Sequence, residues 1–86
     1  MTWTLNLAKR AQKGFAKAPI KSQRLLRAAL VEMQQNPFSG DIVRLTSERA
    51  TWRRRVGSYR ILFDVYPDRQ HIDVVDIARR TSITYR

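Results

Sequence analysis

The chain has 86 residues, and its 17 Lys and Arg against 7 Asp and Glu give a formal net charge of +10 at pH 7. With no cysteine and one histidine, the sequence excludes a disulfide framework, thiol catalysis, a cysteine-based zinc site and a histidine-rich metal cluster. The length fits one domain, residues 1–86, and so strong a positive charge attracts polyanions such as nucleic acid.

No apolar run approaches the roughly 20 residues that a membrane-spanning helix needs, and no signal-peptide pattern opens the sequence. The sequence also contains no repeats, no low-complexity segment and no internal linker. We therefore expect a cytoplasmic protein that does not associate with membranes.

The first half of the chain predicts a strand followed by two helices. Residues 2–7 alternate polar and apolar side chains, which indicates a short strand. Residues 8–18 space their apolar side chains at helical intervals, although Gly14 weakens this helix by about 1 kcal/mol relative to alanine. Pro19 suits the first turn of a second helix, which ends before Pro37. The two helices should form an antiparallel hairpin.

After Gly40 the pattern changes to the two-residue period of β-strands. The predicted strands are residues 42–45, 51–56, 59–66 and 71–77. Turns are expected at Gly57-Ser58 and at residues 67–70. An N-terminal strand, a two-helix antiparallel hairpin and then a sheet of three or four antiparallel strands define an α+β fold.

Four arginines fall within the segment from Trp52 to Arg60. Because successive side chains of a strand point to opposite faces, Arg53 and Arg55 share one face. Neighbouring guanidinium groups repel unless solvent screens them or an anion joins them, and the arginine fork matches phosphate oxygens. The segment therefore indicates a phosphodiester site on a sheet. The alternative is that these arginines are solvated charges that protect an edge strand from aggregation.

Two further arginines of this segment have different expected surroundings. Arg60 belongs to the most apolar strand and faces the same way as Leu62, which makes a functional role the favoured interpretation. Arg54 faces the helices at the margin of the core, where we expect it to pair with Glu32 or Asp64 and to have no role in the site.

Three stretches of the sequence together carry a family resemblance. They are Asn36-Pro37-Phe38-Ser39-Gly40, the block Trp52-Arg53-Arg54-Arg55-Val56-Gly57-Ser58-Tyr59-Arg60-Ile61-Leu62-Phe63, and the tail Ile77-Ala78-Arg79-Arg80 with Tyr85-Arg86. With these motifs the chain resembles the RelE/ParE superfamily of bacterial toxins from toxin–antitoxin operons, over nearly its whole length. RelE-type members cleave mRNA in the ribosomal A site, whereas ParE-type members poison DNA gyrase.

The resemblance implies an endoribonuclease that needs no metal and no cofactor. In the RelE mechanism the ribose 2′-OH attacks the adjacent phosphorus and the 5′-oxygen leaves, so cations must stabilise the growing charge. Transferred position by position, the resemblance assigns the catalytic residues. They are Arg53, Arg55, Arg60, Arg79 and Tyr85. The ring of Tyr85 stacks on a base or donates a proton, or else only covers the core at the chain end.

The sequence departs from the family pattern where proton transfer is concerned. Some members carry a catalytic Glu before the arginine strand and a His near the C-terminus, whereas this chain has Glu48 in the wrong place and Arg80 near the His position. Well-studied members use lysines where this chain has Arg53 and Arg55, and arginine is a poor base. Electrostatic stabilisation is therefore predicted, and the general base stays unassigned.

Basic residues outside the strands are candidates for contacts with RNA phosphates, although those on the first helix also fit an ordinary solvated face. The candidates are Lys9, Arg10, Lys13 and Arg80. His71 follows a turn, and we expect it at the surface without a catalytic role.

The sequence thus predicts the toxin of a type II toxin–antitoxin system, acting as a ribosome-dependent mRNA endoribonuclease that inhibits translation. The expected partners are an acidic antitoxin, mRNA in the ribosomal A site and ribosomal RNA, with operator DNA contacted only through the antitoxin. One alternative is a ParE-type, non-enzymatic inhibitor of DNA gyrase. Another is a degenerate toxin that binds only its antitoxin and operator DNA.

Overall fold

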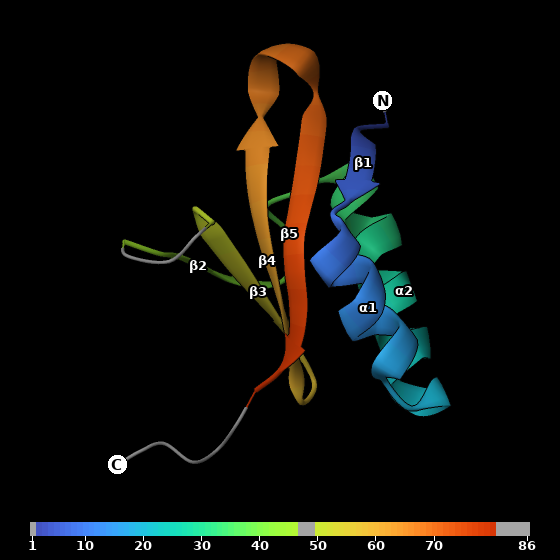
Figure 1. The fold of residues 1–86 in the computed structure, drawn as a ribbon. Helices are drawn as coiled ribbons and strands as arrows, with labels where there is room; N and C mark the ends of the chain where they lie inside the picture. The colour runs from blue at the N-terminus through green and yellow to red at the C-terminus, as the bar shows by residue number, and fades with distance from the viewer. Residues whose placement is uncertain (1, 47–49, 81–86) are drawn as a thin grey trace.

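The computed structural model describes residues 2–46 and 50–80, which form a β-sheet with two helices on one side (Figure 1). The elements are β1 (Thr4–Leu7), α1 (Lys9–Lys17), α2 (Ile20–Gln35), β2 (Asp41–Arg44), β3 (Trp52–Val56), β4 (Tyr59–Tyr66), the 3₁₀ turn η1 (Pro67–Arg69) and β5 (His71–Arg79). The predicted α+β fold with a helical hairpin is confirmed. Neither helix of the described residues has the length and apolar character needed to cross a membrane.

The strands form one five-stranded sheet in the order β1-β5-β4-β3-β2. Strands β2 to β5 pair antiparallel, as predicted. Strand β1 joins the same sheet by pairing parallel with β5, from Thr4 opposite His71 to Leu7 opposite Val74. The sequence pattern predicts β1 but not this partner, because a parallel pairing between distant segments leaves no local signal such as a hairpin turn.

The hydrophobic core lies between the sheet and the two helices. Strands β4 and β5 and both helices contribute its buried side chains: Ala11, Leu26, Ala29, Met33, Tyr59, Ile61, Phe63, Ile72, Val74 and Ile77. The apolar stripe of α2 thus faces the sheet, as its helical spacing predicts. The opposite side of the sheet is left without a helix in the described part of the chain (Figure 1).

Helix α1 packs directly on the backbone of β5. A Cβ atom added to Gly14 would lie 1.8 Å from the carbonyl oxygen of Ile77. No side chain fits in that space, so any other residue would push the helix off the strand. Gly14 therefore lowers helix propensity but permits the contact that anchors α1.

Arg54 joins α2 to β3 through a buried guanidinium group. Its side chain is 9% exposed, and Nη2 donates a hydrogen bond of 2.5 Å to Oε1 of Glu32. Nη1 donates to Oγ of Ser39 at 3.2 Å. The predicted pairing with Glu32 is confirmed, whereas Asp64 instead accepts the backbone N–H of Thr51.

Glu32→Gln should lower the free energy of unfolding by about 1 to 2 kcal/mol, because Arg54 stays buried while its charged acceptor becomes neutral. Urea unfolding of the two proteins measures the difference. Asp68→Asn is the matched control, since it removes an exposed carboxylate from η1 and should change stability by less than about 0.5 kcal/mol. Equal effects of the two substitutions would contradict this role of the pair.

Several predicted boundaries differ from the structure by one or two residues; β1 begins at Thr4, for example, and β2 spans Asp41–Arg44. Pro19 is the N-cap of α2 and precedes its first turn. Strand β5 continues to Arg79 and does not end at Ile77, because the strand stays paired with β4 up to Tyr59 opposite Arg79. The N–H of Arg80 then donates to the carbonyl oxygen of Ser58 at 2.6 Å, which extends this pairing into the turn between β3 and β4.

Candidate functional site

The side of the sheet turned away from the helices, called the open face below, carries three of the candidate arginines. Arg55 lies directly opposite Arg60 across β3 and β4. Arg53 lies on the same face, opposite Leu62. These three arginines form the arginine cluster, and the register places them on one face as strand alternation predicts.

Within the cluster, hydrogen-bond donors remain unused. The Nε atoms of Arg53 and Arg60 are buried and have no hydrogen-bond partner among the described residues. Leu62 lies opposite Arg53 and two residues after Arg60 on the same face. It is only 3% exposed, although no described helix covers this face. Nη1 of the more exposed Arg55 lies 3.7 Å from Oδ2 of Asp41. The cluster therefore holds donors that have no acceptor among the described residues.

Arg55 and Arg60 form a like-charge pair across two strands, which destabilises a sheet. Asp41 offsets this repulsion weakly, because its side chain is 55% exposed. A phosphodiester group would accept hydrogen bonds from both arginines and remove the repulsion. Edge protection does not explain the pair, because Arg53 and Arg55 belong to β3, which has a neighbouring strand on each side.

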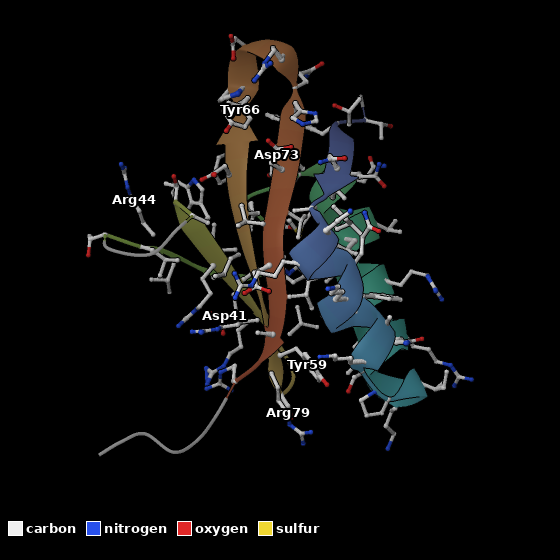
Figure 2. The ribbon with its side chains drawn as sticks, in the orientation of Figure 1. Asp41, Arg44, Tyr59, Tyr66, Asp73 and Arg79 are labelled. Atoms are coloured by element: carbon white, nitrogen blue, oxygen red, sulfur yellow. The ribbon has the colours of Figure 1, made fainter. Side chains whose placement is uncertain are left out.

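Arg79 does not join the arginine cluster, so the structure does not bring together the four arginines that the resemblance assigns to catalysis. It lies opposite Tyr59, a core residue that is 7% exposed, and Figure 2 shows the two at the lower end of the sheet. The cause is a β-bulge in the pairing of β4 with β5 at Leu62/Phe63. One extra residue reverses the alternation, so that Ala78 takes the place opposite Arg60.

The same bulge brings Asp76 to the open face, where sequence reasoning missed it. Asp76 lies opposite Leu62 and thus in the same cross-strand row as Arg53. Unbroken alternation would place Asp76 with Ile72 and Val74 in the core. The consecutive valines at positions 74 and 75 are the one local sign that the alternation breaks.

A basic groove of about 660 Å³ runs between α1 and the end of β5. Its charged and aromatic lining residues are Lys9, Arg10, Lys13, Lys17, Tyr59, Asp76 and Arg79. Three candidate RNA contacts of α1, Lys9, Arg10 and Lys13, line the groove together with Arg79, which the resemblance assigns to the catalytic residues. Lys17 also lines the groove, because it lies one helical turn after Lys13. Tyr59 lines it as the first residue of β4, opposite Arg79.

The remaining candidates lie apart from both surfaces or outside the described residues. Arg80 is exposed just after β5, and Tyr85 lies outside the part of the chain that the structure describes. His71 lies at the other end of β5, with Nδ1 2.8 Å from Oγ1 of Thr4 and Nε2 2.8 Å from Oδ1 of Asp73. The contact with Thr4 joins β1 to β5, and the contact with Asp73 holds the ring within β5, so His71 has a structural role.

The fold matches solved structures of toxins. It superposes on an archaeal RelE–RelB complex from Pyrococcus horikoshii with a TM-score of 0.81 and 19% identity, over 96% of this chain and 100% of that one. The isolated E. coli RelE toxin superposes with a TM-score of 0.76 and 18% identity, over 94% of this chain and 87% of that one. The YoeB/ParE toxin from Agrobacterium tumefaciens superposes with a TM-score of 0.74 and 15% identity, over 91% of this chain and 99% of that one. No protein-family model matches the sequence, and no curated protein does. The chain has the RelE-like fold that its motifs predict.

Proposed function

We propose that the chain is the toxin of a type II toxin–antitoxin system and acts in the cytoplasm as a ribosome-dependent mRNA endoribonuclease. The observation that carries this proposal is the arginine cluster, with Arg55 opposite Arg60 and unused Nε donors on Arg53 and Arg60. Donors arranged in this way suit the oxygens of a phosphodiester. The RelE-like fold supports the same function.

In the proposed reaction, negative charge grows on the non-bridging oxygens of the phosphate as the 2′-oxygen attacks. Guanidinium groups held by a sheet stabilise that charge without rearranging, and one such donor accounts for about 10²- to 10³-fold in rate. Arg53 and Arg60 would hold the phosphate, with Arg55 beside them. Arg79 belongs to the basic groove, where with the cations of α1 it would hold neighbouring phosphates of the RNA.

An acidic antitoxin is the proposed protein partner. Some of the structures that share this fold are complexes of RelE with RelB, among them the E. coli RelBE complex. A partner with negative charge would lower the self-repulsion of a chain whose net charge is +10. Operator DNA would be contacted only through this antitoxin.

Induction of the chain in cells, followed by primer extension on a model mRNA, tests the proposal. We expect growth arrest and cuts within codons occupying the A site, and co-expression of the adjacent open reading frame should relieve the arrest. A variant with Arg53, Arg55 and Arg60 all changed to alanine should produce no cuts. Arrest without cuts would overturn the nuclease, and absence of arrest would overturn the toxin.

Gyrase inhibition is the second candidate, and one observation favours it. Arg79 lies off the open face, so the four arginines that the resemblance assigns to catalysis do not form one site. A gyrase inhibitor would leave mRNA intact and block the supercoiling of relaxed plasmid by purified gyrase. Measuring both activities on one protein preparation separates the two functions.

Cleavage should not require a metal ion at the scissile phosphate, because the arginine cluster supplies the positive charge that a metal would otherwise provide. Replacing one non-bridging oxygen of that phosphate with sulfur tests this without disturbing the ribosome. The modified mRNA should be cleaved at the same rate in Mg²⁺ and in added Mn²⁺. Sulfur at the next phosphate is the control, and rescue by Mn²⁺ confined to the scissile position would contradict the prediction.

A further inference from the structure

We propose that the carboxylate of Asp76 is the general base of the reaction and accepts the proton of the attacking ribose 2′-OH. This inference rests on the proposed endoribonuclease function and deepens it. It assigns the proton acceptor that the arginine cluster lacks, and it names the ribose hydroxyl as the group that the open face recognises beside the phosphate.

The position of Asp76 follows from the register of three strands. Arg53, Leu62 and Asp76 lie in one row across β3, β4 and β5. Arg60 occupies the next row on the same face, opposite Ala78, and is therefore a diagonal neighbour of Asp76. Diagonal neighbours lie about 7 to 8 Å apart, within reach of long side chains. A phosphodiester held by Arg53 and Arg60 would thus place its ribose beside the carboxylate.

The state of this carboxylate distinguishes it from the other acids of the open face. The Asp76 side chain is 17% exposed, and its one ion-pair contact among the described residues is Nε of Arg10 at 3.6 Å from Oδ2. No described residue donates a hydrogen bond to it. Asp64 accepts a backbone N–H, Asp73 is bonded to the histidine, and Asp41 is mostly exposed. Among these acids Asp76 alone is both largely buried and without a hydrogen-bond donor in the described residues, since Arg10 lies beyond hydrogen-bond distance.

The register therefore places the unpaired donors of Arg53 and Arg60 and the carboxylate of Asp76 on one face, around Leu62. Leaving such groups unpaired is unfavourable, so a ligand that completes both kinds of hydrogen bond gains affinity. Phosphate oxygens complete the donors of Arg53 and Arg60, and a hydroxyl group completes Asp76. A ribonucleotide carries both groups, whereas a deoxyribonucleotide carries only the phosphate.

The chemical step balances with these groups. The 2′-oxygen forms a bond to phosphorus while its proton passes to the Asp76 carboxylate. The bond from phosphorus to the 5′-oxygen breaks, and that oxygen takes a proton from solvent. The products are a 2′,3′-cyclic phosphate and a 5′-hydroxyl end. The protonated carboxyl of Asp76 then returns its proton to water.

Asp76→Asn tests the assignment in single-turnover cleavage of mRNA on programmed ribosomes, because asparagine keeps the shape and removes the base. The saturating rate constant should fall at least about 100-fold. The half-saturating concentration should change no more than a few-fold, since the weaker hydrogen bond to the 2′-OH and the loss of a charge that repels RNA oppose each other. Asp73→Asn is the matched control: it makes the same change in the same strand, opposite Asp64 and outside the rows of Arg53 and Arg60, and should keep the wild-type rate.

Two further variants exclude a purely structural role. Arg10→Gln breaks the ion pair but keeps the carboxylate, so it should lose far less of the saturating rate than Asp76→Asn. Asp76→Glu should recover part of the rate. Binding should also show coupling: a 2′-deoxy nucleotide at the cleavage site should weaken binding to the wild type several-fold and binding to Asp76→Asn less, because a neutral amide oxygen accepts a weaker hydrogen bond than a carboxylate.

The outcomes separate this inference from the function on which it rests. If the wild type cleaves and Asp76→Asn cleaves equally well, the inference is wrong and the endoribonuclease stands. Equal losses for Arg10→Gln and Asp76→Asn, or an equal effect of the 2′-deoxy nucleotide on both proteins, would likewise overturn it. If the wild type does not cleave at all, the proposed function and this inference fall together.

Discussion

Arg60→Ala should reduce cleavage of mRNA on programmed ribosomes at least about 100-fold while the protein keeps its fold. The side chain lies on the open face, and its Nε atom is bonded to no described residue, so its removal breaks no internal hydrogen bond. Removing it also ends the repulsion with Arg55 across the two strands. The melting temperature should therefore be unchanged or slightly higher.

Two matched variants accompany this measurement. Arg60→Lys keeps the charge but loses the fork that binds phosphate at two points, so its rate should lie between those of the wild type and Arg60→Ala. Arg69→Ala removes an exposed arginine from the turn between β4 and β5 and should cleave like the wild type. A large drop in the melting temperature of Arg60→Ala would show that Arg60 is structural and would refute the assignment.

Gly14→Ala should destabilise the protein by about 3 kcal/mol, although alanine is the better helix former. Helix propensity alone would raise stability by about 1 kcal/mol. The added methyl group, however, would lie 1.8 Å from the carbonyl oxygen of Ile77, and backbone cannot rotate away as a side chain can. Helix α1 would have to move off β5, and the core contacts of that helix would weaken.

Ala16→Gly provides the control for this substitution. Ala16 is exposed on the same helix, so glycine there should cost about 1 kcal/mol through propensity alone. Urea unfolding of the three proteins measures both effects. Gly14→Ala adds a methyl group and Ala16→Gly removes one, yet both should destabilise the protein. If Gly14→Ala unfolds at a higher urea concentration than the wild type, the packing of α1 on β5 is not as close as described.

Local sequence patterns were sufficient to predict the helices and strands of this fold. The helical stripe that contains Leu26 and Met33 and the alternation of β4 predict which side chains enter the core. The same alternation places Arg53 and Arg55 on one face, and the position of Arg54 at the margin of the core predicts an acidic partner, Glu32 or Asp64, of which the structure shows Glu32. In each case the determining interactions lie within one element or between neighbouring strands.

The site depends on strand register and packing, for which the sequence holds one local sign, the consecutive valines at positions 74 and 75. A single bulge residue moves Arg79 off the open face and brings Asp76 onto it, so an error of one residue changed the proposed chemistry. Lys17 and Tyr59 belong to the basic groove because α1 packs on β5, and that contact depends on the absence of a side chain at Gly14. Register and close approach are properties of the assembled sheet.

Strand β1 pairs with no other described strand than β5, although the two lie near opposite ends of the described chain. Helix α1 also packs mainly on β5. During synthesis, β1 and α1 therefore lack their main partner until the residues of β5 have left the ribosomal tunnel. Such long-range pairing slows folding and makes it depend on nearly the whole chain. A product shortened before β5 would leave the N-terminal half unfolded, so interrupted translation would yield no partly assembled protein with an exposed arginine face.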